Sequence, residues 1–285
     1  MRLAVDHRTG FSYASPVRAS YNEARMTPVS DGHQTVWSSR ISIEPAAWSF
    51  THTDYWGSTV TTFELHEPHE RLTVSAHAVV ETHGDHLPWD TERQVPHSDL
   101  GWAALRDPGV IDPMTDFLTT TARTAPPEEL TALVAEVAQQ PPRLAGLDVC
   151  RIVHDRLRYR RGSTTVSSTA AEVWELGTGV CQDYTHVALG ALRSIGLPAR
   201  YVSGYLHPKP DAGIGQAVTG ESHAWVEWWD GGWNGFDPTN SVPIGNRHVT
   251  LGRGRDYGDV PPFKGLFSGP RSEGHTVTVE VTRLA

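Results

Sequence analysis

The chain has 285 residues, with 33 acidic against 24 basic side chains and a formal charge of -9 at pH 7. An acidic surface repels phosphate backbones and anionic lipids, which argues against a general nucleic-acid or membrane binder. Two cysteines do not make a disulfide framework, and no window has the length and hydrophobicity of a secretory signal or a membrane span. We therefore expect a soluble, cytoplasmic protein.

The first part of the chain, residues 1–86, has the pattern of an antiparallel β domain. Five stretches are rich in β-branched and aromatic residues and show repeated alternation, and glycines and prolines separate them. The predicted strands cover residues 2–13, 34–44, 48–55, 58–66 and 70–82. We interpret this domain as sandwich-like and as a scaffold rather than the place of the chemistry.

Residues 87–113 contain several prolines and few apolar runs, which predicts a linker, and residues 114–285 form the second domain. Helical spacing predicts helices over 128–140 and 144–158. Thr169-Ala-Ala-Glu172 has the spacing of a capping box, which starts a short helix through Trp174. The pattern also predicts strands over 199–206 and 276–284, and it favours loops over 207–220 and 241–269. Long loops beside a site often gate it or select its substrate.

Cys181 stands at the start of a predicted helix, after the turn at Gly177-Thr-Gly-Val180. Apolar residues recur at helical spacing after it until Gly196-Leu-Pro198, a stop signal. The free N–H groups and the positive dipole end of a helix favour a thiolate, which is the reactive form of cysteine. The same N–H groups can donate to the oxyanion that forms when a thiolate attacks a carbonyl.

A base and a group to orient it follow downstream. His223 lies in a predicted strand over residues 221–229, whose side chains alternate between the two faces. Asp230-Gly-Gly232 predicts a hairpin turn, and the returning strand, residues 233–240, would place Asp237 roughly opposite His223. The expected site is a helix-borne cysteine facing a histidine and an aspartate on adjacent antiparallel strands.

Four linked motifs resemble the core of the bacterial transglutaminase-like proteins. They cover roughly residues 150–240 and read Thr178-Gly-Val-Cys181-Gln-Asp-Tyr, Gly196-Leu-Pro-Ala-Arg-Tyr-Val-Ser-Gly-Tyr205, Ser222-His-Ala-Trp-Val-Glu227 and Gly232-Trp-Asn-Gly-Phe-Asp-Pro-Thr-Asn240. The N-terminal part is similar to the small β domain that precedes this core in one bacterial subgroup. Its shorter motifs are His7-Arg-Thr-Gly-Phe-Ser-Tyr13, Pro16-Val-Arg-Ala-Ser20, Met26-Thr-Pro28 and Ile43-Glu-Pro45.

The resemblance implies an α+β fold, in which the N-terminal antiparallel β-sandwich-like domain precedes a papain-like core with a helix-borne cysteine packed on an antiparallel sheet. It also implies a catalytic triad, carried over onto Cys181, His223 and Asp237. Such a triad would make the protein a thiol-dependent enzyme that forms a thioester from an amide bond of a peptide or protein substrate. Nothing in the chain has the pattern of a calcium loop, so we expect no metal and no cofactor.

The acyl acceptor stays open at this point. Water would make the enzyme a peptidase or amidase, the alternative we favour because bacterial members of the family resemble hydrolases more often. An amine would make it a transglutaminase-type acyltransferase. In another class of function the triad is idle and the protein binds a peptide through a tryptophan-lined groove, or it acts as a scaffold through its β domain.

Other side chains near these motifs have structural or substrate-binding interpretations. Trp225, Tyr205 and Trp174 surround the three motifs and are the candidates for walls of a substrate groove. We interpret Cys150 and His186 as core residues. Asp183 suits a helix cap, because a carboxylate in the first turn complements the helix dipole.

Overall fold

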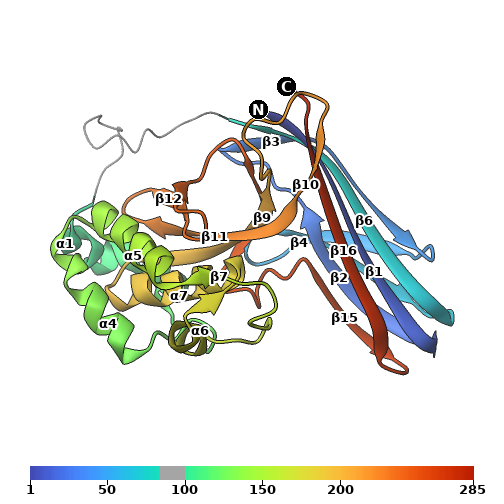
Figure 1. Ribbon diagram of the computed structural model, residues 1–285, viewed down its shortest axis with the longest axis horizontal. Helices are drawn as coiled ribbons and strands as arrows, with labels where there is room; N and C mark the ends of the chain where they lie inside the picture. The colour runs from blue at the N-terminus through green and yellow to red at the C-terminus, as the bar shows by residue number, and fades with distance from the viewer. Residues whose placement is uncertain (84–99) are drawn as a thin grey trace.

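The computed structural model describes residues 1–83 and 100–285, and its architecture is α+β with mostly antiparallel sheets. Long strands of a β domain lie on one side of the molecule, and a second sheet covered by helices lies on the other (Figure 1). This arrangement confirms the predicted fold class.

The β domain begins with six strands. They are β1 (Arg2–Val17), β2 (Ala19–Thr27), β3 (Gln34–Glu44), β4 (Ser49–Thr53), β5 (Thr59–Leu65) and β6 (His69–Thr82). Five of them match the predicted strands to within a few residues at each end. The sixth, β2, was not predicted, because its inward positions include polar or small side chains such as Ser20, Asn22 and Ala24. Its alternation of buried and exposed residues therefore leaves no hydrophobic period of two.

Two sheets make up this domain, and both contain strands from the far end of the chain. The longer sheet has the order β10-β16-β1-β6-β3, and the smaller has the order β15-β2-β5-β4. The late strands are β10 (Ala217–Thr219), β15 (Phe263–Ser268) and β16 (Ser272–Arg283). Strand pairing thus places three strands of the predicted 114–285 unit in the sheets of the N-terminal domain. The prediction that 241–269 is a loop is wrong, since three strands lie within it.

The predicted linker is only partly a linker. Residues 84–99 lie outside the described residues. The segment after them forms α1 (Trp102–Leu105), α2 (Pro108–Ile111), η1 (Asp112–Met114) and α3 (Thr115–Leu118). These one-turn helices were not predicted because each is too short to show a helical period.

The helices of the second domain follow the predictions closely. They are α4 (Glu128–Ala135), η2 (Val137–Gln139), α5 (Pro142–Arg156), α6 (Ala170–Leu176) and α7 (Cys181–Ser194), with the short parallel strands β7 (Arg158–Tyr159) and β8 (Thr178–Gly179). Thr169 caps α6 by accepting a hydrogen bond from the Glu172 backbone N–H, and the Glu172 carboxylate accepts one from the Thr169 N–H. The predicted capping box is confirmed.

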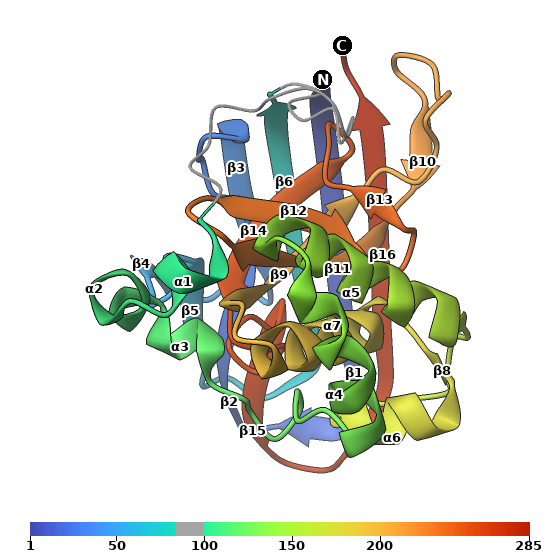
Figure 2. The same cartoon turned by 90° about the vertical axis from the view of Figure 1, so that its left-hand side faces the viewer.

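The sheet of the second domain has the order β13-β12-β11-β9-β14. Its strands are β9 (Ala199–Leu206), β11 (Glu221–Trp229), β12 (Trp233–Asp237), β13 (Val242–Pro243) and β14 (His248–Gly254). Helices α5 and α7 lie over one face of this sheet, as Figure 2 shows from the helical side.

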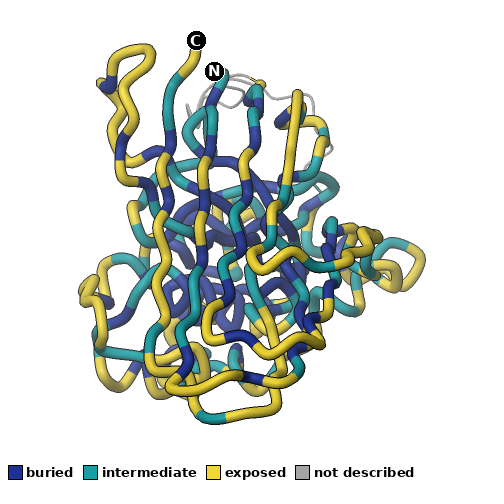
Figure 3. Tube along the Cα trace, turned by 90° about the vertical axis from the view of Figure 1, so that its right-hand side faces the viewer, coloured by how far each residue is buried: buried dark blue, intermediate teal, exposed yellow. Residues whose placement is uncertain are grey.

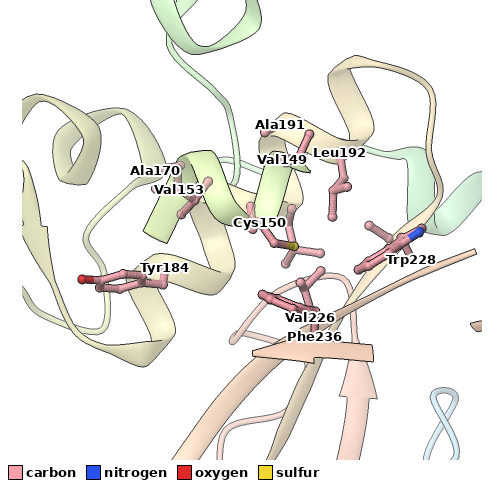
Figure 4. Packing of buried hydrophobic residues seen from close by; sticks show 14 of the residues in the cluster. Val149, Cys150, Val153, Ala170, Tyr184, Ala191, Leu192, Val226, Trp228 and Phe236 are labelled. Carbon is pink, nitrogen blue, oxygen red and sulfur yellow. The ribbon is translucent and has the colours of Figure 1, made fainter. Parts of the chain in front are cut away.

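The core under these helices is closely packed. Cys150 lies among Val149, Leu192, Val226 and the indole of Trp228, with its sulfur directed into the cluster (Figure 4). Burial and the charge of Asp237 raise the pKa of its thiol far above the usual value, so this cysteine stays protonated. The interpretation of Cys150 as a core residue is confirmed.

The longer sheet of the β domain presents one face to solvent and the other to two different partners. Along β1, buried residues alternate with half-buried or exposed ones over the first eight positions, and exposed segments cover much of the solvent face in Figure 3. One end of the inner face packs on β9 and β14 of the second domain, through Leu3 and Val5. The other end packs on the smaller sheet, through Tyr13 and Val17.

Candidate active site

The backbone before Cys181 is fixed by two glycines and one carboxylate. Gly177 ends α6 in the left-handed conformation, with φ of 66°. A Cβ on Gly179 would lie 2.7 Å from the Cβ of Asp183, so this approach requires glycine. The Asp183 carboxylate accepts hydrogen bonds from the Val180 N–H at 2.7 Å and from the Thr164 hydroxyl at 2.6 Å. Asp183 is therefore a cap, as predicted, and Cys181 is the first residue of α7.

The hairpin of β11 and β12 carries the other two predicted site residues. His223 Nε2 lies 2.7 Å from Asp237 Oδ2, and a further hydrogen bond joins the imidazole to the side chain of Cys181. The strands pair from Trp229 with Trp233 to Val226 with Phe236, so Asp237 lies diagonal to His223 rather than directly opposite it. All three predicted residues meet at one place.

Asp237 is held by more donors than the sequence predicted. Its Oδ1 accepts from the backbone N–H groups of Thr239 and Asn240 at 2.9 and 3.1 Å, and its Oδ2 accepts from Asn240 Nδ2 at 2.6 Å. His248 Nε2 lies 3.5 Å from the same Oδ2. Asn240 was within a quoted motif without a role, whereas His248 lay in a segment expected to be a loop, so only spatial proximity reveals it.

The second histidine of this cluster has a defined tautomer. The Gly245 N–H donates to His248 Nδ1 at 3.2 Å, so that nitrogen carries no proton. Burial lowers the pKa of His248, although the Asp237 carboxylate opposes this, and the ring is neutral. Its one proton is therefore on Nε2, which lies 3.5 Å from Asp237 Oδ2, an electrostatic contact rather than a well-formed hydrogen bond. A neutral His248 stabilises the Asp237 carboxylate without neutralising its negative charge.

The electrostatics of the cluster favour a protonated His223. Burial lowers the pKa of this imidazole, but hydrogen bonds to Asp237 and Cys181 and their negative charges outweigh burial and raise it to about 10. Burial opposes the ionised form of Asp237 as well, yet the donors around it hold the pKa of the carboxyl far below its usual value. An imidazolium paired with the Asp237 carboxylate and facing the Cys181 sulfur is the state that this geometry stabilises.

One group of side chains has the composition of a metal site. The ligand atoms of His223, Asp237 and His248 all lie within 4.8 Å of one another. Two ligands of one tetrahedral zinc ion, each about 2.1 Å from the metal, would lie about 3.4 Å apart. The 2.7 Å between His223 and Asp237 is instead a hydrogen-bond distance, so this donor set fits a proton-transfer network better than a metal. The absence of a metal requirement stays a prediction.

A cavity of about 510 Å³ opens beside Cys181, between the second domain and the β domain. Cys181 and His223 contribute to one wall together with Tyr201, and β1, β15 and β16 contribute the opposite wall. A carbonyl group in this cavity can therefore approach the thiol, the imidazole and the first turn of α7 at the same time.

The three predicted substrate-binding residues do not line this cavity. Trp225 and Tyr205 expose at most 1% of their surface and Trp174 exposes 3%, so they are core residues. Trp225 packs on the ring of His248, and the Tyr205 hydroxyl bonds to His7 Nδ1 at 2.9 Å. The prediction was wrong because proximity in sequence to the motifs does not determine which side of the sheet or helix a large ring covers.

Two further expectations can be compared with the structure. His186 is fully buried, and its Nε2 accepts a hydrogen bond from the Tyr257 N–H, so it is a core residue as predicted. Within residues 1–83 and 100–285, no helix combines the length and the hydrophobicity needed to cross a membrane.

Comparison with known proteins relates both parts of the chain to described families. Residues 3–81 match the bacterial transglutaminase-like N-terminal region, and residues 131–238 match the transglutaminase-like superfamily. An uncharacterized protein of Mycobacterium leprae is 44% identical over all of this chain and 99% of its own length. An uncharacterized protein of Mycobacterium tuberculosis is 33% identical over 98% of this chain and 91% of its own length.

Two other relatives carry functional names. A protein-glutamine gamma-glutamyltransferase of Pseudomonas aeruginosa is 29% identical over 49% of this chain and 22% of its own length. A solved structure from Cytophaga hutchinsonii, provisionally named a cysteine protease, superposes with a TM-score of 0.72 at 18% identity. It covers 98% of this chain and 90% of its own. At that identity the likeness establishes the fold alone.

Proposed function

The chain belongs to the transglutaminase-like superfamily, and we propose that it is a cysteine-dependent enzyme that breaks an amide bond through a thioester intermediate. The observation that carries this proposal is the hydrogen-bonded series of Cys181, His223 and Asp237 at the cavity wall. A nucleophile, a base and a group that orients the base are the parts that acyl transfer requires.

In the first half-reaction the Cys181 sulfur attacks the carbonyl carbon of the bound amide. The carbonyl oxygen becomes an oxyanion, which the free N–H groups at the start of α7 are placed to stabilise. The N–H groups of Asp183 and Tyr184 already donate to the Val180 carbonyl, which leaves those of Cys181 and Gln182 for this role. The C–N bond then breaks, the His223 imidazolium gives its proton to the leaving nitrogen, and a thioester remains on the enzyme.

In the second half-reaction the neutral imidazole of His223 accepts a proton from the acyl acceptor, which attacks the thioester. The C–S bond breaks, the sulfur leaves as thiolate, and the imidazolium forms again. With water the product is a carboxylic acid, and with an amine it is a new amide. We favour water, and the provisional name of the Cytophaga protein agrees with it. The name of the Pseudomonas relative supports the amine as the second candidate.

A burst experiment with an activated ester tests the proposal. Purified protein is mixed with p-nitrophenyl acetate, and we expect a burst of p-nitrophenolate equal to the enzyme concentration, with the acetyl group found on Cys181 by peptide mass spectrometry. Cys181→Ala and His223→Ala should each abolish the burst. Cys150→Ala, a change at the buried second cysteine, is the matched control and should retain it.

The steady-state phase separates the two acceptors. A fluorescent primary amine is added, and transfer of the acetyl group to the amine at the expense of acetate would indicate an acyltransferase. Release of acetate alone would indicate a hydrolase. Two results together would contradict the proposed enzyme and favour a binding module. They are the absence of a burst and acetylation of Cys181 that is no faster in the native protein than in His223→Ala.

A further inference from the structure

The cavity beside Cys181 lies at the middle of the inner face of the longer β sheet. One end of this face packs on the second domain, and the other end packs on the smaller sheet. Along β1, the side chains of Thr9, Phe11 and Tyr13 follow at every second residue, so they share one face of the strand. Residues nearer the chain start pack on the second domain, and Tyr13 packs on the smaller sheet. The two packing surfaces diverge between these ends, and the cavity occupies the space.

Aromatic rings from three strands cover the side of the cavity opposite Cys181. Phe11 packs on Phe263 with ring centroids 4.9 Å apart and stacks on His275 at 4.7 Å and 12°, while Tyr13 packs on Phe267 at 5.0 Å. We call this surface the aromatic wall; its members are Phe11, Tyr13, Phe263, Phe267 and His275. The rings support one another, and Phe267 remains 40% exposed.

The described residues that line the cavity include no aspartate, glutamate, lysine or arginine. Burial, together with the nearby His275 ring, lowers the pKa of His7 to about 4, so this lining residue is neutral near pH 7. The imidazolium of His223 in this lining is already paired with Asp237. A charged group moved from water into such a place would therefore lose its hydration without gaining a free partner of opposite charge. Binding of an apolar group would instead be favourable, because the group would leave water and pack on the faces of the aromatic rings.

We propose that this cavity selects acyl donors in which the group next to the reacting carbonyl is an uncharged aromatic or aliphatic side chain, bound against the aromatic wall. The β domain would then determine specificity, with Phe267 as an accessible specificity-determining residue. This inference rests on the proposed function, because it assumes that the acyl group bound to Cys181 occupies the cavity.

Two chloromethyl ketones that differ only in the side chain test the proposal. N-acetyl-phenylalanine chloromethyl ketone and N-acetyl-aspartate chloromethyl ketone both alkylate the Cys181 sulfur; a C–S bond forms and chloride leaves. The second-order rate at Cys181 is measured by peptide mass spectrometry and divided by the rate with iodoacetamide, which is too small to occupy the wall. Phe267→Ala reduces the wall, Phe267→Arg adds a positive charge, and Leu266→Ala is the matched control. Leu266 is the neighbouring residue on β15, 73% exposed and outside the cavity lining.

We expect the native protein to prefer the phenylalanine reagent by about tenfold or more. Phe267→Ala should reduce this ratio to about threefold or less, Phe267→Arg should shift it toward the aspartate reagent, and Leu266→Ala should keep the native ratio. Equal rates for the two reagents, with rapid His223-dependent labelling by iodoacetamide, would overturn the inference and leave the nucleophile intact. Slow iodoacetamide labelling that is unchanged in His223→Ala would overturn the proposed function, and this inference with it.

Discussion

Replacing Asp237 by asparagine should leave the shape of the site unchanged but remove the acceptor at the Oδ2 position, which serves both His223 and Asn240 Nδ2. The amide oxygen can still accept from the N–H groups of Thr239 and Asn240. The amide NH2 would then occupy the place of Oδ2, and it can only donate to His223 Nε2. The imidazole proton would move to Nδ1, the ring nitrogen left to face Cys181. In that tautomer His223 cannot accept the proton of the thiol.

The size of the effect follows from the pKa of His223. Raising it from 6.5 to about 10 corresponds to roughly 5 kcal/mol of net stabilisation of the imidazolium, which Asp237 and Cys181 together supply against the opposing effect of burial. If the carboxylate supplies about half, its loss removes roughly 2 to 3 kcal/mol. The population of the thiolate–imidazolium pair, and with it the reactivity of Cys181, should fall roughly 30- to 150-fold near neutral pH.

Alkylation by iodoacetamide, read at Cys181 by peptide mass spectrometry, measures this reactivity across the pH range. The loss in Asp237→Asn should be largest in mildly acidic and neutral buffer and should shrink in alkaline buffer, where hydroxide deprotonates the thiol without help. Asp148→Asn makes the same chemical change on the surface of α5 and should label like the native protein. Labelling of Asp237→Asn at the native rate in mildly acidic buffer would refute the argument that Asp237 holds the imidazolium.

Three further outcomes can be measured. Burial lowers the pKa of both His7 and His186 from 6.5 to about 4, so the unfolded chain binds more protons than the folded chain between these pH values. The free energy of unfolding should therefore fall by up to about 3 kcal/mol per histidine as the pH drops from 6.5 to 4. Urea unfolding of His7→Asn should show a smaller fall over the same pH range. His248→Phe removes a polar group that lies 3.5 Å from the Asp237 carboxylate, so Cys181 alkylation at neutral pH should slow about threefold to tenfold and its dependence on pH should move to higher values. An unchanged pH profile would assign His248 a packing role only. A Cβ on Gly146 would lie 2.4 Å from the Trp228 ring, so Gly146→Ala should lower the free energy of unfolding by about 1 to 3 kcal/mol. Urea unfolding measures this loss as a lower midpoint, and an unchanged midpoint would contradict the close packing of α5 on the sheet.

The sequence predicted the parts of the fold that have strong local signals. The capping box at Thr169, the stop signal after α7 and the alternation in β11 each depend on a few neighbouring residues, and each prediction agrees with the structure. The strands β14 and β15 lack such signals. Glycines interrupt both, and they are stabilised by pairing with β9 and β2, so a local pattern cannot identify them.

The site shows the same division between local and spatial information. Cys181, His223 and Asp237 belong to motifs of characteristic composition, and the structure brings them together. His248 and the aromatic wall depend instead on how β14 and the late strands pack, which no window of the sequence reports. The error over Trp225 has the same cause, because a tryptophan next to a catalytic motif can as easily fill the core as the cavity.

The pairing of β1 with β16 sets an order of events during protein synthesis. Leu3 lies opposite Arg283, so a strand that is synthesised early completes its sheet with a strand that is synthesised much later. At about 5 to 20 residues per second, one edge of β1 waits roughly 15 to 60 seconds for this partner. An unpaired edge can join the strands of other chains in that interval. The nascent chain should therefore depend on chaperones until β16 emerges, and a fragment that stops after β6 should aggregate.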